Sequence, residues 1–176
     1  MKRKRPSPSA FAPRRSRVNI RSNILQIMPE DPNQNLADNS LTDDERPLFV
    51  YGTLRRGGSN DIAHFGAGSR LLGAARVRGA LYDLGAYPGM VLGGSAWVWG
   101  ELYAITQSLE SRLDRLEEVW PQATGEYRRS QAMVMLQVGH GERALSALIY
   151  ALDCARAQDS ALIEGGDWII HVGRRA

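Results

Sequence analysis

Four carboxylates lie in one short segment, residues 108–120, whose apolar positions repeat at helical spacing. These positions, at intervals of 4, 3 and 4, are Leu109, Leu113, Leu116 and Trp120. At ~100° per residue they fall within about 60° of one another and form the face that we expect to be buried. Glu118 then points nearly opposite that face and Asp114 well toward water, whereas Glu117 lies only about 70° from its centre.

Glu117 and Glu110 are therefore the acids of this segment that can enter a cleft while still reaching a substrate. At the border between core and solvent, desolvation favours the neutral carboxyl and raises its pKa toward the working range of a general acid or base. The alternative is an ordinary boundary glutamate that pairs with an arginine such as Arg112 or Arg129. The periodicity leaves both interpretations open.

A second candidate for chemistry is the glycine-containing segment YGTLRRGGSN, residues 51–60, which follows the first apolar run. Its glycines let the backbone turn sharply and approach a ligand closely. Consecutive backbone amides in such a loop form a concavity suited to a carboxylate or a phosphate. The segment has neither the Walker pattern nor the dinucleotide fingerprint, so a nucleotide loop of either kind is excluded. A plain β-turn is the alternative.

Short apolar runs punctuated by glycine predict the strands that position these groups. The runs, each a strand or a strand pair, are residues 48–51, 70–84, 96–105, 131–138 and 144–152. Two segments are predicted to be helical: residues 108–120, with Thr106 or Ser108 as the N-terminal cap, and a shorter one around 61–65. These elements predict an α+β domain, with a curled sheet or small barrel and a helix on one side.

The composition divides the chain into a tail, residues 1–45, and one domain, residues 46–176. Eight of the 22 Lys and Arg lie in the first 22 residues without any acid, so the net charge of +3 does not indicate a basic nucleic-acid-binding domain. The tail is poor in apolar residues, and we expect it to be disordered. A solvated tail, a nuclear-import or nucleic-acid patch and an organelle transit peptide all fit its basic start, but a secretory signal does not.

Cysteine and histidine limit the kinds of site that the chain can form. The single cysteine, Cys154, excludes an intramolecular disulfide and a cysteine-based zinc cluster, and it fits a reducing compartment. The three histidines, at 64, 140 and 171, lie far apart, so we expect no His-rich metal site. No apolar run approaches the ~18 residues of a membrane span. We expect a cytoplasmic protein.

Six strings, in order along the chain, carry a resemblance to a known family. They are FVYGTLRRG at 49–57, ALYDLGAYPGMV at 80–91, GELY at 100–103, LDRLEE at 113–118, EYRR at 126–129 and GGDW at 165–168. Together they resemble the gamma-glutamylcyclotransferase family, particularly its small bacterial members and the gamma-glutamylamine cyclotransferases. The resemblance extends from about residue 48 to residue 170.

The resemblance implies a small mixed β-barrel with flanking helices and a cavity roofed by the Tyr-Gly-Thr-Leu loop. In the family, the backbone amides of this loop hold the α-carboxylate of a γ-glutamyl group. Carried over to this chain, the substrate-binding residues are Tyr51, Gly52, Thr53 and Leu54. The family's catalytic glutamate ends a motif that corresponds here to residues 113–117, which makes Glu117 the general acid and base.

The same resemblance implies further binding residues. Tyr127 and Arg129 fall on the family's Tyr-x-Arg, where the tyrosine lines the pocket and the arginine positions a carboxylate. Glu101 is a weaker candidate, and a structural hydrogen-bonding role for it is an equal alternative. No metal or organic cofactor is implied.

The implied activity is release of 5-oxoproline and a free amine or amino acid, by attack of the substrate's own α-amine on its γ-carbonyl. The expected partner is a small-molecule γ-glutamyl substrate, without a membrane or nucleic acid, and both a monomer and a homodimer stay open. The leaving group is also open among amino acids, amines and biosynthetic intermediates, with glutathione less favoured. The rival hypotheses are a module that binds a small carboxylate without turnover and an adaptor that acts through its basic tail.

Overall fold

The computed structural model describes residues 40–117 and 125–175, so most of the expected tail and the predicted positions of Glu118 and Trp120 lie outside the described residues. The elements in chain order are β1 (Glu45–Val50), η1 (Ile62–Phe65), β2 (Ser69–Asp83), β3 (Pro88–Thr106), α2 (Gln107–Leu116), β4 (Tyr127–Val138), β5 (Gly141–Leu152), η2 (Cys154–Ala157), β6 (Ala161–Leu162) and α3 (Trp168–Gly173).

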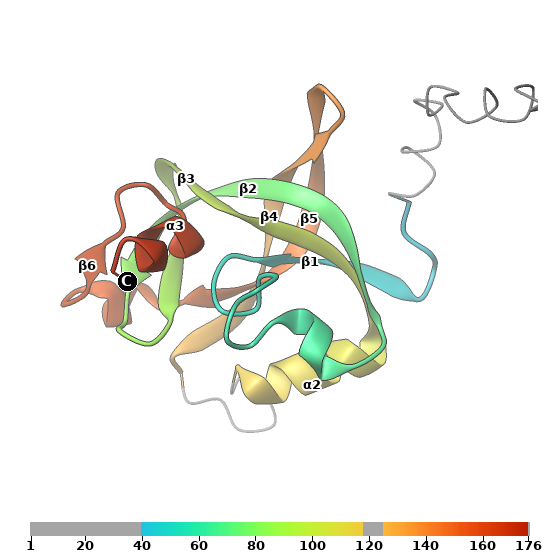
Figure 1. The fold of residues 1–176 in the computed structure, drawn as a ribbon, viewed down its shortest axis with the longest axis horizontal. Coiled ribbons are helices and arrows are strands. Elements are labelled where there is room, and N and C mark those ends of the chain that lie inside the picture. Colours follow the sequence, from blue (N-terminus) through green and yellow to red (C-terminus); the bar gives the residue numbers. More distant parts are fainter. Residues whose placement is uncertain (1–39, 118–124, 176) are drawn as a thin grey trace, which may run out of the picture. The chain divides into compact units, whose positions relative to one another are not determined.

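The five long strands close into a ring (Figure 1). In the described part of the chain the strand order is β3-β1-β5-β4-β2-β6, and β3 also pairs with β2. β1 and β5 run parallel, and the other pairs are antiparallel. The β2–β3 pairing carries register shifts between Leu71 and Gly73 and between Arg78 and Gly79. Because such irregularities bend strands, they allow the sheet to curl. The predicted α+β class with a small mixed barrel is confirmed.

The predicted elements are found, with changes at their ends. Each of the five apolar runs lies in a strand except for its final residue in two cases, Tyr51 and Leu84, and β3 begins earlier than expected, at Pro88. The segment around 61–65 forms the short helix η1, which Asp61 caps by accepting the amide of Ala63. Thr106 is the cap of α2, as predicted, and its side chain accepts the amide of Leu109. The short elements η2, β6 and α3 were not predicted from the sequence.

Two apolar cores lie on opposite faces of β1, β3 and β5. In β1, Phe49 packs with the cluster inside the ring, while Leu48 and Val50 pack with a second cluster that includes Leu109 and Leu113 of α2. Alternate residues of β3 and β5 divide in the same way. Because successive side chains of a strand point to opposite faces, strands buried on both faces need continuous apolar runs. This explains the runs LFVY, LYAI and ALIYAL.

The buried face of α2 differs from the face predicted by its leucines. Leu109 and Leu113 are fully buried, but Glu110 and Asp114 are also buried, and Leu116 is 39% exposed. The predictions that Leu116 is buried and that Asp114 faces water were therefore wrong. The physical reason is that Tyr150 and Arg129 offer polar partners to the acidic side of the helix. The observed face is rotated so that its centre lies within about 10° of the direction of Glu117.

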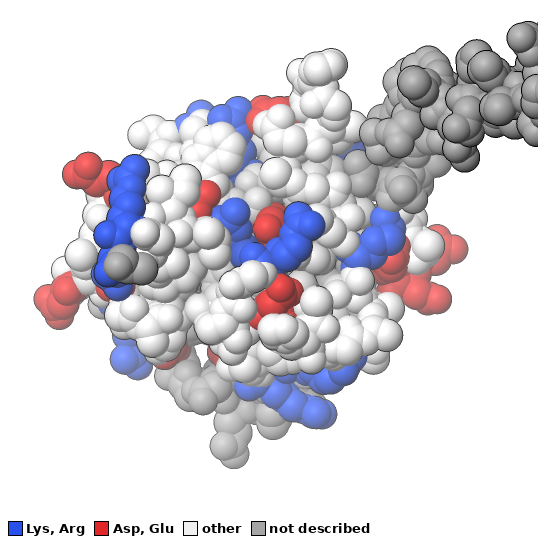
Figure 2. Space-filling view, viewed as in Figure 1, with Lys and Arg blue, Asp and Glu red and all other residues white. Residues whose placement is uncertain are grey.

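Charged side chains of both signs are interspersed on the visible face of the molecule (Figure 2). Arg76 and Glu142, for example, form an ion pair at 2.8 Å. This mixed surface agrees with the nearly neutral composition of the domain.

Gly100 gives a direct test of how closely the ring is packed. A Cβ atom at this position would lie 2.2 Å from the carbonyl oxygen of Val50 and 2.7 Å from the Phe49 ring. We expect Gly100→Ala to lower the free energy of unfolding by about 1–3 kcal/mol, because backbone and core would have to shift. Urea unfolding measures the change. In the control Gly165→Ala, a Cβ meets nothing within 4 Å, and equal loss in both variants would contradict the close approach.

Candidate functional site

A cavity of about 280 Å³ opens where the loop after β1, the end of α2 and the start of β4 meet. Its lining residues are Phe49, Val50, Tyr51, Gly52, Thr53, Leu54, Asn60, Tyr87, Pro88, Leu116, Glu117, Glu126, Tyr127 and Tyr150. This volume lies near the lower end of the range for small-molecule sites. The cavity therefore has room for a small polar ligand.

The loop after β1 is held by its own backbone and by Asp61. Thr53 and Leu54 use their carbonyl groups to accept the amides of Asn60 and Ile62. The Asp61 carboxylate accepts the amides of Gly57 and Ala63, and these hydrogen bonds lower its pKa. Across the described residues, no acceptor is found for the amides of Gly52, Thr53 and Leu54. The loop thus presents three consecutive free N–H groups beside the cavity.

Gly52 is required by the close approach of this loop to the first residue of β3, Pro88. A Cβ atom at Gly52 would lie 2.7 Å from Cγ of Pro88, which is closer than such atoms can come. Pro88 also accepts a hydrogen bond from the hydroxyl of Tyr127, at 3.0 Å. Because Gly52 has no side chain, the loop after β1 can pack directly against Pro88 in the cavity wall.

Glu117, at the C-terminal end of α2, is the carboxylate that this helix places in the cavity lining. It ends the helix, and its amide donates to the carbonyl of Leu113 at 2.9 Å. Burial raises the pKa of Glu117 to about 7, with a smaller contribution from the negative charge of Glu126. Counting only partners among residues 40–117 and 125–175, its carboxylate makes no hydrogen bond or ion pair.

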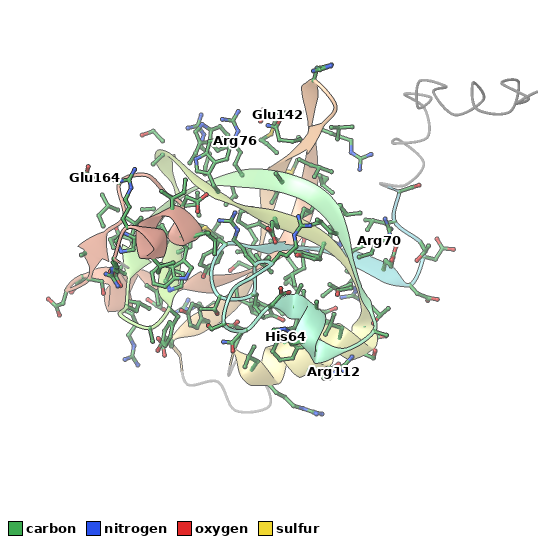
Figure 3. All side chains as sticks on the ribbon, viewed as in Figure 1. His64, Arg70, Arg76, Arg112, Glu142 and Glu164 are labelled. Carbon is green, nitrogen blue, oxygen red and sulfur yellow. The ribbon has the colours of Figure 1, made fainter. Side chains whose placement is uncertain are left out.

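The two arginines considered as partners of Glu117 have other partners. Arg112 donates to the carbonyl groups of Phe65 and Ala67, so it lies against η1, near His64 (Figure 3). Arg129 lies 2.8 Å from Oδ2 of Asp114 and 3.1 Å from Oε1 of Glu110. The interpretation of Glu117 as an ordinary paired boundary residue therefore finds no support in the described residues.

Three tyrosines form walls of the cavity with fixed orientations. The Tyr51 hydroxyl donates to the backbone carbonyl of Tyr150 at 2.7 Å, and the Tyr150 hydroxyl donates to Oδ1 of Asp114 at 2.8 Å. Burial is the largest cause that raises the pKa of Tyr51, Tyr127 and Tyr150. These phenols therefore stay neutral, and each keeps its proton for the hydrogen bond that it donates.

Asp114 joins the helix to the sheet beside the cavity. Its two carboxylate oxygens accept from Tyr150 of β5 and from Arg129 of β4. Both partners are strand residues, so these bonds fix the rotation of α2 and, with it, the direction of Glu117 one turn away. Glu110, on the same helix face, shares Arg129.

Glu101 and Arg129 do not line the cavity, whereas residues 51–54, Glu117 and Tyr127 do. Glu101 accepts from the amide of Arg56 and from the hydroxyl of Tyr103, both at 2.9 Å. This arrangement favours the structural alternative for Glu101. Arg129 pairs with Asp114 and Glu110 and does not face the cavity.

Arg55, in the loop after β1, is held by two carboxylates. Its side chain is only 14% exposed and pairs with Asp167 at 2.9 Å and with Glu101 at 3.9 Å. Asp167 also caps α3 by accepting the amide of Ile170. The GGDW string therefore serves to anchor the loop after β1.

Several lining residues were not assigned to the site from the sequence. Among them are Tyr87, Pro88, Glu126 and Tyr150. The signal was present for three of them, because the strings ALYDLGAYPGMV and EYRR contain Tyr87, Pro88 and Glu126. Tyr150 carries no such signal, since it lies in an ordinary apolar strand.

No group of three or more His, Cys, Asp and Glu side chains in the described ranges is arranged to hold a metal ion. Within those ranges, too, none of the helices has the length and apolar character needed to cross a membrane.

Comparisons with known proteins agree on one family. The model of the family described as gamma-glutamyl cyclotransferase, AIG2-like, matches residues 48–169. A Vibrio cholerae protein whose name assigns it to the gamma-glutamylcyclotransferases is 40% identical over 125 residues, which cover 69% of this chain and 93% of that protein.

Two further matches, one curated relative and one solved structure, cover less than half of the matched protein. The gamma-L-glutamyl-butirosin B gamma-glutamyl cyclotransferase of Niallia circulans is 40% identical over 72 residues, 40% of this chain and 45% of that protein. The crystal structure of YkqA from Bacillus subtilis is similar with a TM-score of 0.56 and 27% identity, over 75% of this chain and 43% of that one. The chain thus spans less than half of the length of these two proteins.

Glu117 should titrate near neutral pH. Its pKa of about 7 lies above the ordinary value of 4.5, so the folded state binds the proton more tightly. The stabilising contribution of the protonated group is full below about pH 4.5 and is lost as the pH rises through about 7. The stability of the wild type relative to Glu117→Gln should therefore fall across this range. Carboxyl-carbon NMR gives the pKa directly, and a midpoint near the ordinary value would contradict the burial.

Removing the Asp114 carboxylate should loosen α2. We expect Asp114→Asn to lower the free energy of unfolding by about 1–3 kcal/mol, because buried hydrogen bonds to Arg129 and Tyr150 are lost or weakened. Tyr150→Phe should cost about 1 kcal/mol. Urea unfolding measures both variants. The control is Asp159→Asn, at an exposed aspartate, and equal stability of Asp114→Asn and this control would show that the network contributes nothing.

Proposed function

The chain belongs to the gamma-glutamyl cyclotransferase, AIG2-like family and is an enzyme of that type, and we propose that it converts a γ-glutamyl amide into 5-oxoproline and a free amine with Glu117 as general acid and base. The observation that carries the proposal is the position of Glu117. It is unpaired among the described residues, has a pKa of about 7, and lines the same small cavity as three free backbone amides.

The free amides of Gly52, Thr53 and Leu54 suit the α-carboxylate of the glutamyl group. Backbone N–H groups bind a carboxylate through charge-assisted hydrogen bonds, which are stronger than neutral ones. No hydrogen bond within the described chain has to be broken to make these contacts. A carboxylate held here fixes one end of the glutamyl chain, so that its amine and γ-carbonyl can meet inside the cavity.

Ring closure uses one molecule as both nucleophile and electrophile. The α-amine attacks the γ-carbonyl carbon, a new C–N bond closes the five-membered ring, and the original amide C–N bond then breaks. Because both groups belong to the same held substrate, proximity supplies a large part of the rate.

Glu117 would transfer the protons that this reaction requires. As a carboxylate it takes a proton from the α-ammonium group, which is not nucleophilic until it loses one. As the resulting carboxylic acid it gives that proton to the departing nitrogen, so that the leaving group is a neutral amine and not an amide anion. The carboxylate formed again then takes the excess proton of the ring nitrogen and releases it to the solvent, which leaves the neutral lactam. A pKa of about 7 keeps both forms accessible near neutral pH, which is the condition for efficient acid and base catalysis.

The tyrosines support this proposal by shaping the cavity. Tyr51 and Tyr127 are neutral at ordinary pH, and their hydroxyl protons are directed to backbone carbonyl groups. They therefore do not compete with Glu117 for a proton. Their rings supply apolar surface, which keeps water away from Glu117 and maintains its raised pKa.

Replacement of the carboxyl group tests the assignment. We expect Glu117→Gln to reduce the rate of 5-oxoproline release from γ-glutamyl amides by at least ~100-fold, because the amide cannot carry a proton between the two nitrogens. The exposed Glu164 provides a control, since Glu164→Gln makes the same change of charge away from α2 (Figure 3). An undiminished rate in Glu117→Gln would refute the role of Glu117. Ligand binding without any 5-oxoproline would instead favour the non-catalytic binding module.

A further inference from the structure

Two of the residues that line the cavity carry a carboxyl group. They are Glu117, already assigned to proton transfer, and Glu126, at the start of the segment that leads into β4. The Tyr87 hydroxyl donates to Oε1 of Glu126 at 3.0 Å, and Tyr87 is 39% exposed. The carboxylate of Glu126 is therefore fixed in direction at the open side of the cavity.

No Arg, Lys or His is found among the described residues that line this cavity. Three arginines that are close in sequence to lining residues are paired elsewhere: Arg55 with Asp167, Arg128 with Asp153, and Arg129 with Asp114. Residues 118–124, whose sequence is EVWPQAT, contain no basic residue. No described lining residue therefore offsets the charge of Glu126.

The glutamyl half of the substrate already has its partners. The amides of the loop after β1 bind its carboxylate, and Glu117 serves its amine. The leaving group must extend toward the open side, where Tyr87 and Glu126 lie. A carboxylate on the leaving group would meet the negative charge of Glu126 there, while an ammonium group would meet a fixed acceptor.

On the basis of the proposed function, we infer that the preferred substrates are γ-glutamyl conjugates of amines that carry a second, positively charged group, and that Glu126 selects them. Leaving groups with a carboxylate, such as free α-amino acids, are disfavoured. Glu126 acts on specificity, and Glu117 acts on the reaction itself.

Three substrates of equal length isolate the effect of charge. They are the mono-γ-glutamyl amides of 1,5-diaminopentane, pentylamine and 5-aminopentanoate, whose leaving groups end in an ammonium, a methyl and a carboxylate. Release of 5-oxoproline by the full chain gives kcat/KM for each. We expect the cationic substrate to exceed the anionic one by at least about tenfold, with the neutral one between them. High salt should reduce this ratio in the wild type, because it screens charges at the open side.

Variants then assign the preference to one residue. In Glu126→Gln, the ratio of cationic to anionic kcat/KM should fall by about tenfold. The loss of the Glu126 charge also lowers the pKa of Glu117, but this second effect is shared by all three substrates and leaves the ratio unchanged. Tyr87→Phe, which leaves the charge but frees the carboxylate, should reduce the ratio less. The charge-matched control Glu164→Gln should keep the wild-type ratio. A thermal melt of each variant confirms folding, and the salt dependence of the wild type tests the charge effect without any substitution.

Each of the other outcomes overturns a definite part of the inference or of the proposed function. Equal turnover of the three substrates by the wild type would refute the substrate class but leave the cyclotransferase proposal intact. A preference that persists in folded Glu126→Gln would refute the role of Glu126. An equal loss for all three substrates in that variant would show that Glu126 serves the shared glutamyl half, which also refutes the inference. Turnover of none of them would refute the proposed function and this inference together.

Discussion

The candidate site depends on the rotation of one helix, which Asp114 fixes through its bonds to Tyr150 and Arg129. These bonds place a polar edge of α2 against the sheet and leave Leu116 half exposed. A helix turned to bury all of its leucines would carry Glu117 away from the cavity. The buried acid is thus part of the reason that Glu117 lies in a setting poor in water, and this setting raises its pKa toward neutrality.

Much of the fold could be predicted because β1, β3 and β5 are buried on both faces, and such strands must be continuously apolar. The helix was located by its leucines, but its rotation was not predicted. Burial of Asp114 depends on Arg129 and Tyr150, which are distant in sequence and visible only in the structure. Hydrophobic periodicity takes no account of polar partners, so it correctly buried Leu109 and Leu113 but turned the rest of the buried face toward Leu116 instead of Asp114.

The site residues, like the fold, could be predicted only where neighbouring residues in the sequence carry the signal. Residues 51–54 and Glu117 were identified from local strings, and they line one cavity. Arg129 and Glu101 lie in equally recognisable strings but serve to hold neighbouring elements. A string of residues indicates a family, yet it cannot show whether a side chain faces a cavity or a neighbouring strand. That distinction depends on which partners the fold brings close.

The ion pair between Arg55 and Asp167 joins two residues that are 112 positions apart in sequence. Beside it, Trp168 packs into the cluster inside the ring, and Gly166 accepts a hydrogen bond from the amide of Trp99. During synthesis the chain emerges from its N-terminal end. The loop after β1 therefore appears early but gains this anchor only when nearly the whole domain has left the ribosome. A nascent chain that lacks β6 and α3 would carry the residues of the site without the support of this anchor.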